Sequence, residues 1–281
     1  MAISNFIPTV WSETLYEALD KNYIAVKNCN RDFDGDIKEQ GSIVKICGVG
    51  NINVFDYNKN TNMTSMQTLT DTCVELRINR ARAFNFQIDD IDRAQANPKL
   101  MQAAMKVAAS ALANDADKYI YSLYSNVDVS RTISVDSVSA DNIIDWVIKA
   151  REQLYLNNVI NNDDIVLEVT PEIASLLIKA KILNSNDTSD SALSGGTIGS
   201  IAGCKVYVSN NICKEDNIDS LSHKCFMRTK RAIAFADQLS EINAYRPESR
   251  FADAVKGLHL YGAEIVYPKE LFVLDLRIPY N

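Results

Sequence analysis

The stretch NPKLMQAAMKVAASALANDADKYIYSLY, residues 97–124, decides the fold. It contains no glycine, and its only proline, Pro98, stands at the first position of the expected helix. A missing N–H costs nothing there, and Asn97 can cap the backbone. Apolar residues recur three or four positions apart and predict a single amphipathic helix, about 40 Å long. The predicted apolar stripe consists of Met101, Met105, Ala108, Leu112, Ala116, Tyr119 and Leu123.

The segments before this helix change from a short helical pattern to a strand pattern. Within residues 1–35, apolar spacing around Trp11 and Leu15 predicts a short amphipathic helix, and Phe6 adds further apolar surface near the start. This surface either packs on the chain's own core or docks on a neighbouring molecule. Strands are expected at residues 42–47, 51–56, 73–79 and 83–88. Residues 57–71 between them are polar, lack glycine and proline, and are long for a hairpin tip.

The second half of the chain reads as an α/β unit followed by returning strands. Helices are expected at residues 141–156, with Ile148 among the inward positions, and from Thr170-Pro171-Glu172 onward, with Thr170 as the cap. A flexible loop is expected at residues 184–200. Further strands are expected at residues 164–169, 205–209, 225–229, 232–236, 242–246, 258–268 and 271–278. Gly262, inside one of these strands, predicts a bulge or a close backbone approach.

Composition narrows the class of protein. The net charge of -7 and the sequence pI near 5.0 argue against a protein that wraps phosphate backbones. No signal peptide and no apolar run of about 20 residues is present, so we expect a soluble protein made in a cytosol. The six cysteines form no C-x-x-C pair, and we interpret them as buried free thiols from a reducing compartment. They are Cys29, Cys47, Cys73, Cys204, Cys213 and Cys225.

Patterns that could support chemistry are weak. His223 and His259 lie far apart in sequence and have no neighbouring metal-type residues. The carboxylate pairs Asp115 with Asp117 and Glu248 with Asp253 are best interpreted as surface charge. The glycines at 195, 196, 199 and 203 match neither the G-x-x-x-x-G-K-[ST] spacing nor the G-x-G-x-x-G spacing of phosphate-binding loops. We therefore predict no catalytic, cofactor-binding or metal-binding residues.

Taken in order, the elements resemble the major capsid protein of tailed double-stranded-DNA bacteriophages, which has the Hong Kong 97-like fold. Three stretches carry most of the resemblance. FNFQIDDIDRAQANPKLMQAAM (84–105) resembles the start of the family's spine helix, and IGSIAGCKVYVSNNI (198–212) resembles a segment of its apical lobe. AIAFADQLSEINAYRPESRFADAVKGLHLYGAEIVYPKEL (232–271) resembles its return into the peripheral lobe.

The resemblance implies an α+β chain in five parts. These are an N-terminal arm (1–35), an extended β-hairpin loop (36–85), a peripheral lobe with the spine helix (86–125), an α/β apical lobe (126–236) and the return strands of the peripheral lobe (237–281). It also implies self-assembly into hexamers and pentamers of an icosahedral shell that encloses DNA without reading its sequence. Assembly in the host bacterial cytoplasm, a separate scaffolding protein and a portal follow from the same resemblance. Subunit contacts are expected from Phe6, Trp11, Tyr57, Lys59, Met63, Met66 and Leu69.

Three alternatives remain at this point. An encapsulin-like compartment shares the fold but encloses protein cargo. An enzyme would need a convergent constellation of reactive groups, and none is visible in the sequence. A tail-tube or other virion protein is disfavoured by the long helix, because those folds rest mainly on sheets and barrels.

Overall fold

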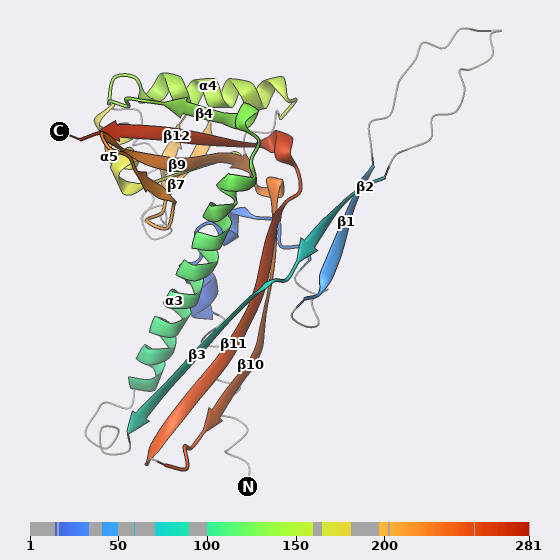
Figure 1. The fold of residues 1–281 in the computed structure, drawn as a ribbon, viewed down its shortest axis with the longest axis vertical. Helices are drawn as coiled ribbons and strands as arrows, with labels where there is room; N and C mark the ends of the chain where they lie inside the picture. The colour runs from blue at the N-terminus through green and yellow to red at the C-terminus, as the bar shows by residue number, and fades with distance from the viewer. Residues whose placement is uncertain are drawn as a thin grey trace.

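The protein is described here by a computed structural model, in which a long helix runs beside a narrow three-stranded sheet and ends against a wider sheet (Figure 1). The structure describes residues 15, 17–33, 41–49, 59, 71–89, 100–159, 165–180, 197–201, 203–249 and 251–280. None of the helices in these ranges is both long and apolar enough to cross a bilayer.

The long helix, α3, covers Leu100–Ser122 and continues into a 3-10 turn, η3, at Leu123–Asn126. The predicted stripe is confirmed at Met105, Leu112, Ala116 and Leu123, whereas Ala108 and Tyr119 are only half-buried. The buried side is broader than the predicted stripe, because small side chains let the helix lie close to its neighbours. It adds Ala109, Ala113, Asp117, Ile120 and Tyr121. The side chain of Met101 lies outside the described part of the chain.

The three-stranded sheet is antiparallel throughout, in the order β10 (Ile233–Tyr245), β11 (Ala252–Ile265), β3 (Arg80–Asp89). Successive side chains of a strand point to opposite faces, and both faces of this sheet are covered near β10 and β11. Phe235, Tyr261 and Ala263 pack in the cluster that contains α3. Ala234, Ala236 and Leu260 pack in a separate cluster on the other face.

That second face receives a two-stranded hairpin, β1 (Ile43–Val49) with β2 (Asp71–Arg77). The N-terminal segment packs instead in the cluster that contains α3. It is helical at residues 15 and 17–22 and forms a 3-10 turn, η1, at Val26–Asn28. Leu15 and Leu19 are buried in the α3 cluster, which confirms the short amphipathic helix within the described residues.

The wider sheet has seven strands. Its order is β4 (Thr132–Val135), β12 (Leu271–Pro279), β9 (Ser220–Thr229), β5 (Ile165–Val169), β7 (Cys204–Val208), β6 (Thr197–Ile201), and β8 (Lys214–Asp216) pairs with β9. The pairs β4–β12 and β5–β7 are parallel, and the others are antiparallel.

The two faces of this sheet have different partners. Helices α4 (Ile143–Leu156) and α5 (Pro171–Lys179) pack on one face, against residues such as Leu167 and Met227. Phe226 and Val273 point to the other face and join the cluster that holds α3 and the N-terminal segment. The seven-stranded sheet therefore meets the rest of the molecule through one face.

Most expected elements are present, with several differences. The sequence patterns did not predict the short strands β4 and β8. The strands expected at 232–236 and 242–246 are one continuous strand, β10, and β6 begins at Thr197 inside the expected loop. Ile148 is 50% exposed rather than inward, because the inward side of α4 follows Ile143, Val147 and Leu154. The strand expected at residues 51–56 lies outside the described residues.

Candidate functional site

The hairpin is attached to the three-stranded sheet at its base. Val44 and Leu76 are buried against Ala234 and Leu260, and they set the hairpin's inward face. The chain leaving β2 crosses β11 at Gly262, where an added Cβ would lie 2.2 Å from the carbonyl oxygen of Arg77. No side chain fits in that space, so the glycine prediction of a close backbone approach is confirmed.

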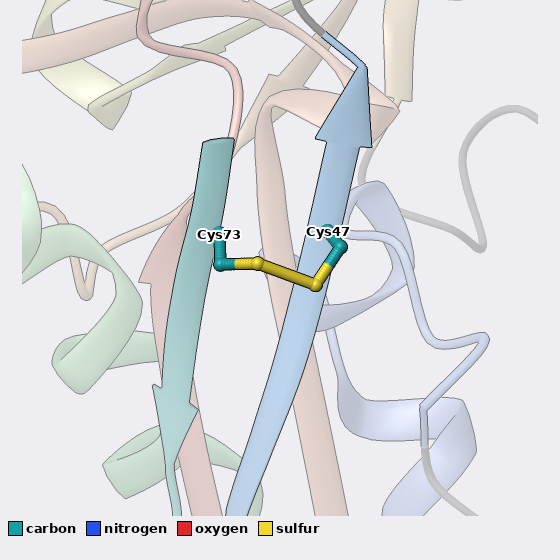
Figure 2. The surroundings of a disulfide bond; sticks show 2 residues. All are labelled: Cys47 and Cys73. Carbon is teal, nitrogen blue, oxygen red and sulfur yellow. A yellow bond between two sulfur atoms is a disulfide. The ribbon is translucent and has the colours of Figure 1, made fainter. Parts of the chain in front are cut away.

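Cys47 and Cys73 form a disulfide across the hairpin (Figure 2). The interpretation of all six cysteines as buried free thiols is therefore wrong for this pair. The antiparallel register places the two residues directly opposite each other, with their Cα atoms 4.2 Å apart, and both are exposed. Their separation of 26 residues hid the pairing, because only the register brings them together.

The other four cysteines are free. Cys29, Cys204 and Cys225 are buried, and Cys213 is half-buried. Burial raises the pKa of Cys29 to about 11 and that of Cys225 to about 12, so both remain protonated thiols at neutral pH. For these four residues the interpretation as structural thiols is supported, with Cys213 less enclosed than expected.

Asp117 binds the N-terminal segment to α3. Its carboxylate accepts the backbone N–H groups of Ile24 at 3.0 Å, Ala25 at 3.0 Å and Val26 at 3.2 Å. The side chain is 1% exposed, so the interpretation of Asp117 as surface charge is wrong. Desolvation outweighs these hydrogen bonds and raises the pKa of Asp117 to about 7. The first turn of η1 thereby gains the acceptors that its free N–H groups require.

Arg228 binds the carbonyl side of the same segment. Its guanidinium makes a bidentate pair with Glu168, at 2.9 and 3.0 Å, and donates to the carbonyl oxygens of Ala25 (3.1 Å) and Asn28. The Asn28 amide also donates to Glu168 at 3.0 Å. Both charged side chains are fully buried, so β5, β9 and the N-terminal segment are fixed to one another by a satisfied polar cluster.

Asp237 on β10 is a third attachment point. It accepts hydrogen bonds from Tyr23 (2.8 Å), Arg31 (3.1 Å) and His259 (3.1 Å). Burial opposes ionisation of this carboxyl, but His259, Arg31 and Tyr23 outweigh it and hold its pKa below the ordinary value. Residues 23–31 are therefore held at a single junction between α3 and both sheets.

A fourth carboxylate joins α3 to the three-stranded sheet. Asp115 accepts from Arg82 on β3 at 2.7 Å and from the hydroxyl of Tyr261 on β11. Asp115 and Asp117 are close in sequence but bind different elements, so they form no catalytic pair. Glu270, in the turn η7 (Pro268–Glu270), is also bound by other elements: it accepts hydrogen bonds from Thr229 at 2.5 Å and from Arg231 at 2.8 Å.

The described residues contain no constellation for catalysis or metal binding. No group of three or more histidine, cysteine or acidic side chains within them could hold a metal ion. His223 is buried and shares a 2.9 Å hydrogen bond with Thr170, whose hydroxyl makes no capping bond to α5. A surface hollow of 370 Å³ lies beside η3 and is lined by Asp128, Ser130, Arg131 and Glu264 among others, without a histidine or cysteine.

Of the expected contact residues, only Lys59 lies within the described part of the chain. Phe6, Trp11, Tyr57, Met63, Met66 and Leu69 lie outside the described residues. Lys59 is described and is an exposed turn residue. Of the glycine-rich stretch, Gly199 lies in β6 and Gly203 in the turn before β7, where the Arg151 guanidinium lies against its backbone.

These features define a chain with a buried polar junction and a disulfide-bridged hairpin, and with no metal-binding cluster among its described residues. A family model described as phage capsid protein matches residues 36–274. The chain belongs to this family, and its function is that of a major capsid protein, the repeating subunit of a virion shell. No curated protein matches the chain.

Solved structures agree on the fold, which is Hong Kong 97-like. A protein of Mycobacterium phage Che8 is similar over 90% of both chains, with 29% identity and a TM-score of 0.70. The capsid of Ralstonia phage GP4 has a TM-score of 0.70 at 9% identity, covering 90% of this chain and 87% of that one. A virus-like particle from Pyrococcus furiosus has a TM-score of 0.56 at 11% identity, covering 96% and 99%.

Proposed function

We propose that copies of this chain form hexamers and pentamers that close into the icosahedral head shell of a phage. The family match across residues 36–274, together with the 29% identity to the Che8 protein, carries the proposal. The shell encloses double-stranded DNA and is assembled in the cytoplasm of the bacterial host. A net charge of -7 suits a container that does not grip its cargo.

The parts of the chain receive roles by the same proposal. Residues 1–35 are the N-terminal arm, 36–85 the extended loop with β1 and β2 as its stem, and 86–125 the part of the peripheral lobe that holds the spine helix α3. Residues 126–236 are the apical lobe, and 237–281 complete the peripheral lobe. Among the described residues, β1 and β2 pair only with each other and contact the three-stranded sheet through Val44 and Leu76, which supports a role for the loop outside its own subunit.

The proposed partners are a scaffolding protein and a portal. Contacts between subunits are proposed at Phe6, Trp11, Tyr57, Lys59, Met63, Met66 and Leu69. We further propose that the chain has no enzymatic activity. In support, the buried carboxylates Asp117, Glu168 and Asp237 are all occupied by structural hydrogen bonds.

A compartment that encloses protein cargo is a second candidate, because the Pyrococcus furiosus virus-like particle has a similar fold. At 11% identity this similarity concerns the fold alone. The content of purified particles separates the two functions: nuclease-protected double-stranded DNA supports the phage head, and a stoichiometric second protein inside supports the compartment.

The direct test is sedimentation and negative-stain microscopy of the purified full chain at micromolar concentration. Rings or closed shells are expected. A stable monomer, unchanged by crowding or scaffolding protein, contradicts the proposal. Deleting residues 60–67 and closing the gap with a short turn tests the loop separately. Circular dichroism and thermal melting are expected to stay nearly unchanged while shells are lost, and normal shells from this variant would refute the assembly role of the loop.

A further inference from the structure

The Cys47–Cys73 disulfide occupies a particular place on the hairpin. The ladder runs from Ile43 opposite Arg77, at the base, to Val49 opposite Asp71, where the chain enters residues 50–70. The cysteines face each other across the two strands (Figure 2), two pairs from that distal end. Both residues are exposed. Small redox reagents in solution therefore reach the bond directly.

The two ends of the stem are held by different means. Near the base, Val44 and Leu76 are buried against the three-stranded sheet. Toward the distal end, β1 and β2 pair only with each other among the described strands. An isolated two-stranded ribbon is marginally stable in water. The disulfide therefore adds a covalent connection to the backbone pairing of β1 with β2 in the distal part of the stem.

We propose that Cys47 and Cys73 are a redox-responsive staple of the hairpin stem. With both thiols reduced, the distal pairs open readily. Oxidation closes the disulfide and keeps β1 and β2 paired up to the point where the chain enters residues 50–70. By the proposed function, on which this consequence alone rests, the staple is open during assembly in a reducing cytosol and closes in particles released from the cell.

The oxidant belongs to the class of low-molecular-weight disulfides. The thiolate of one cysteine attacks such a disulfide and releases one small thiol, leaving a mixed disulfide on the protein. The thiolate of the facing cysteine then attacks the protein sulfur of that mixed disulfide and releases the second small thiol. Two protein thiols are oxidised, one small disulfide is reduced to two thiols, and the two protons lost by the cysteines are taken up by these products.

The test compares the full-length chain equilibrated in reduced and in oxidised glutathione, with its assembly state measured in parallel. Alkylation and peptide mass mapping report the state of each cysteine. Hydrogen exchange reports the stem at residues 43–49 and 71–77. We expect an intrachain Cys47–Cys73 cross-link in oxidised glutathione. Exchange in the distal half of the stem should then be slower by on the order of tenfold or more, with little change near Val44 and Leu76.

Two variants make the result specific. Cys47→Ser with Cys73→Ser should exchange like the reduced wild type in both buffers. Cys213→Ser, which removes the half-buried thiol, should keep the full response. The proposal is overturned if the pair stays reduced in oxidised glutathione, if it cross-links only between chains, or if stem exchange is the same in both states. Mass mapping and hydrogen exchange can be measured on unassembled chains. A failure to assemble would therefore contradict the proposed function, while the exchange rates would still decide whether the disulfide acts as a staple.

Discussion

Replacing Arg228 by methionine should destabilise the subunit strongly. The side chain is 0% exposed, and its guanidinium supplies both hydrogen bonds of the bidentate pair with Glu168 as well as bonds to two carbonyl oxygens of the N-terminal segment. Methionine fills much of the volume but leaves Glu168 as a buried charge, with only the Asn28 amide still bonded to it among the described contacts. Breaking a buried pair in this way costs about 3–5 kcal/mol of the free energy of unfolding.

The matched control removes both charges. Arg228→Met combined with Glu168→Leu leaves no unpaired charge at the position of this ion pair, so the double variant should lose clearly less stability than Arg228→Met alone. The loss of stability should not vanish, because the carbonyl oxygen of Asn28 loses its donor Arg228, which costs about 1–3 kcal/mol for a group left unsatisfied. The carbonyl oxygen of Ala25 also loses Arg228 but keeps the backbone N–H of Asn28 at 3.1 Å. The assay is urea unfolding of the unassembled chain, followed by circular dichroism at a fixed protein concentration.

Two results would refute this reasoning. One is an Arg228→Met variant whose unfolding midpoint equals that of the wild type, which would mean that the cluster is not buried as described. The other is a double variant that is less stable than the single variant, which would mean that the charge on Glu168 is not the source of the cost.

Three further predictions use the same assay. Leu112→Ala should lower the free energy of unfolding by about 2–5 kcal/mol, because it leaves a cavity beneath α3. Lys106→Ala, at an exposed position, should change it by no more than about 0.5 kcal/mol. Equal unfolding midpoints for the two variants would show that the buried side of α3 is misassigned. Gly262→Ala should lower the free energy of unfolding by about 1–3 kcal/mol, because the new Cβ meets the carbonyl oxygen of Arg77. The control Gly41→Ala tests backbone strain alone, because the space around Gly41 is open but its φ is +90°. An unchanged midpoint for Gly262→Ala would contradict the close backbone crossing. The pKa of Asp117 is raised from 3.8 to about 7, so between these pH values the folded chain holds a proton that the unfolded chain has lost. The stability that the protonated Asp117 contributes is therefore fully present below pH 3.8 and is lost as pH rises through about 7. Asp117→Asn should therefore show a smaller fall in unfolding midpoint between pH 5 and pH 8 than the wild type, and parallel falls would contradict the raised pKa.

Local patterns were sufficient to predict most of the helices and strands, but not the short strands β4 and β8. The three-to-four spacing in residues 97–124 predicted α3, and the alternation in residues 73–79 and 83–88 predicted β2 and β3, because each signal depends on neighbours within a few residues. Gly262 was informative for a similar reason, since a glycine inside a strand has few explanations.

The junction and the disulfide could not be predicted, because they depend on residues far apart in the chain. Asp117 stands in the polar run Asn-Asp-Ala-Asp and looks like surface charge until the backbone of residues 24–26 is placed over it. The Cys47–Cys73 pair depends on a register that Val44 and Leu76 determine by their burial. The contact residues expected from family resemblance stay a prediction.

The separation in sequence of the groups at the junction bears on how the chain folds as it is synthesised. The side-chain amide of Asn28 binds Glu168, which is 140 residues later in the sequence. The carbonyl oxygen of Ala25 accepts from Arg228, which is 203 residues later. Long-range contacts of this kind are slow to form, because a long loop must close before they bring any gain. A nascent chain can bind its N-terminal segment to Asp117 once α3 has formed, but it cannot make the contacts with Arg228 until β9 has left the ribosome. Fragments that end before β9 lack this junction, so the step that completes the subunit comes late in translation.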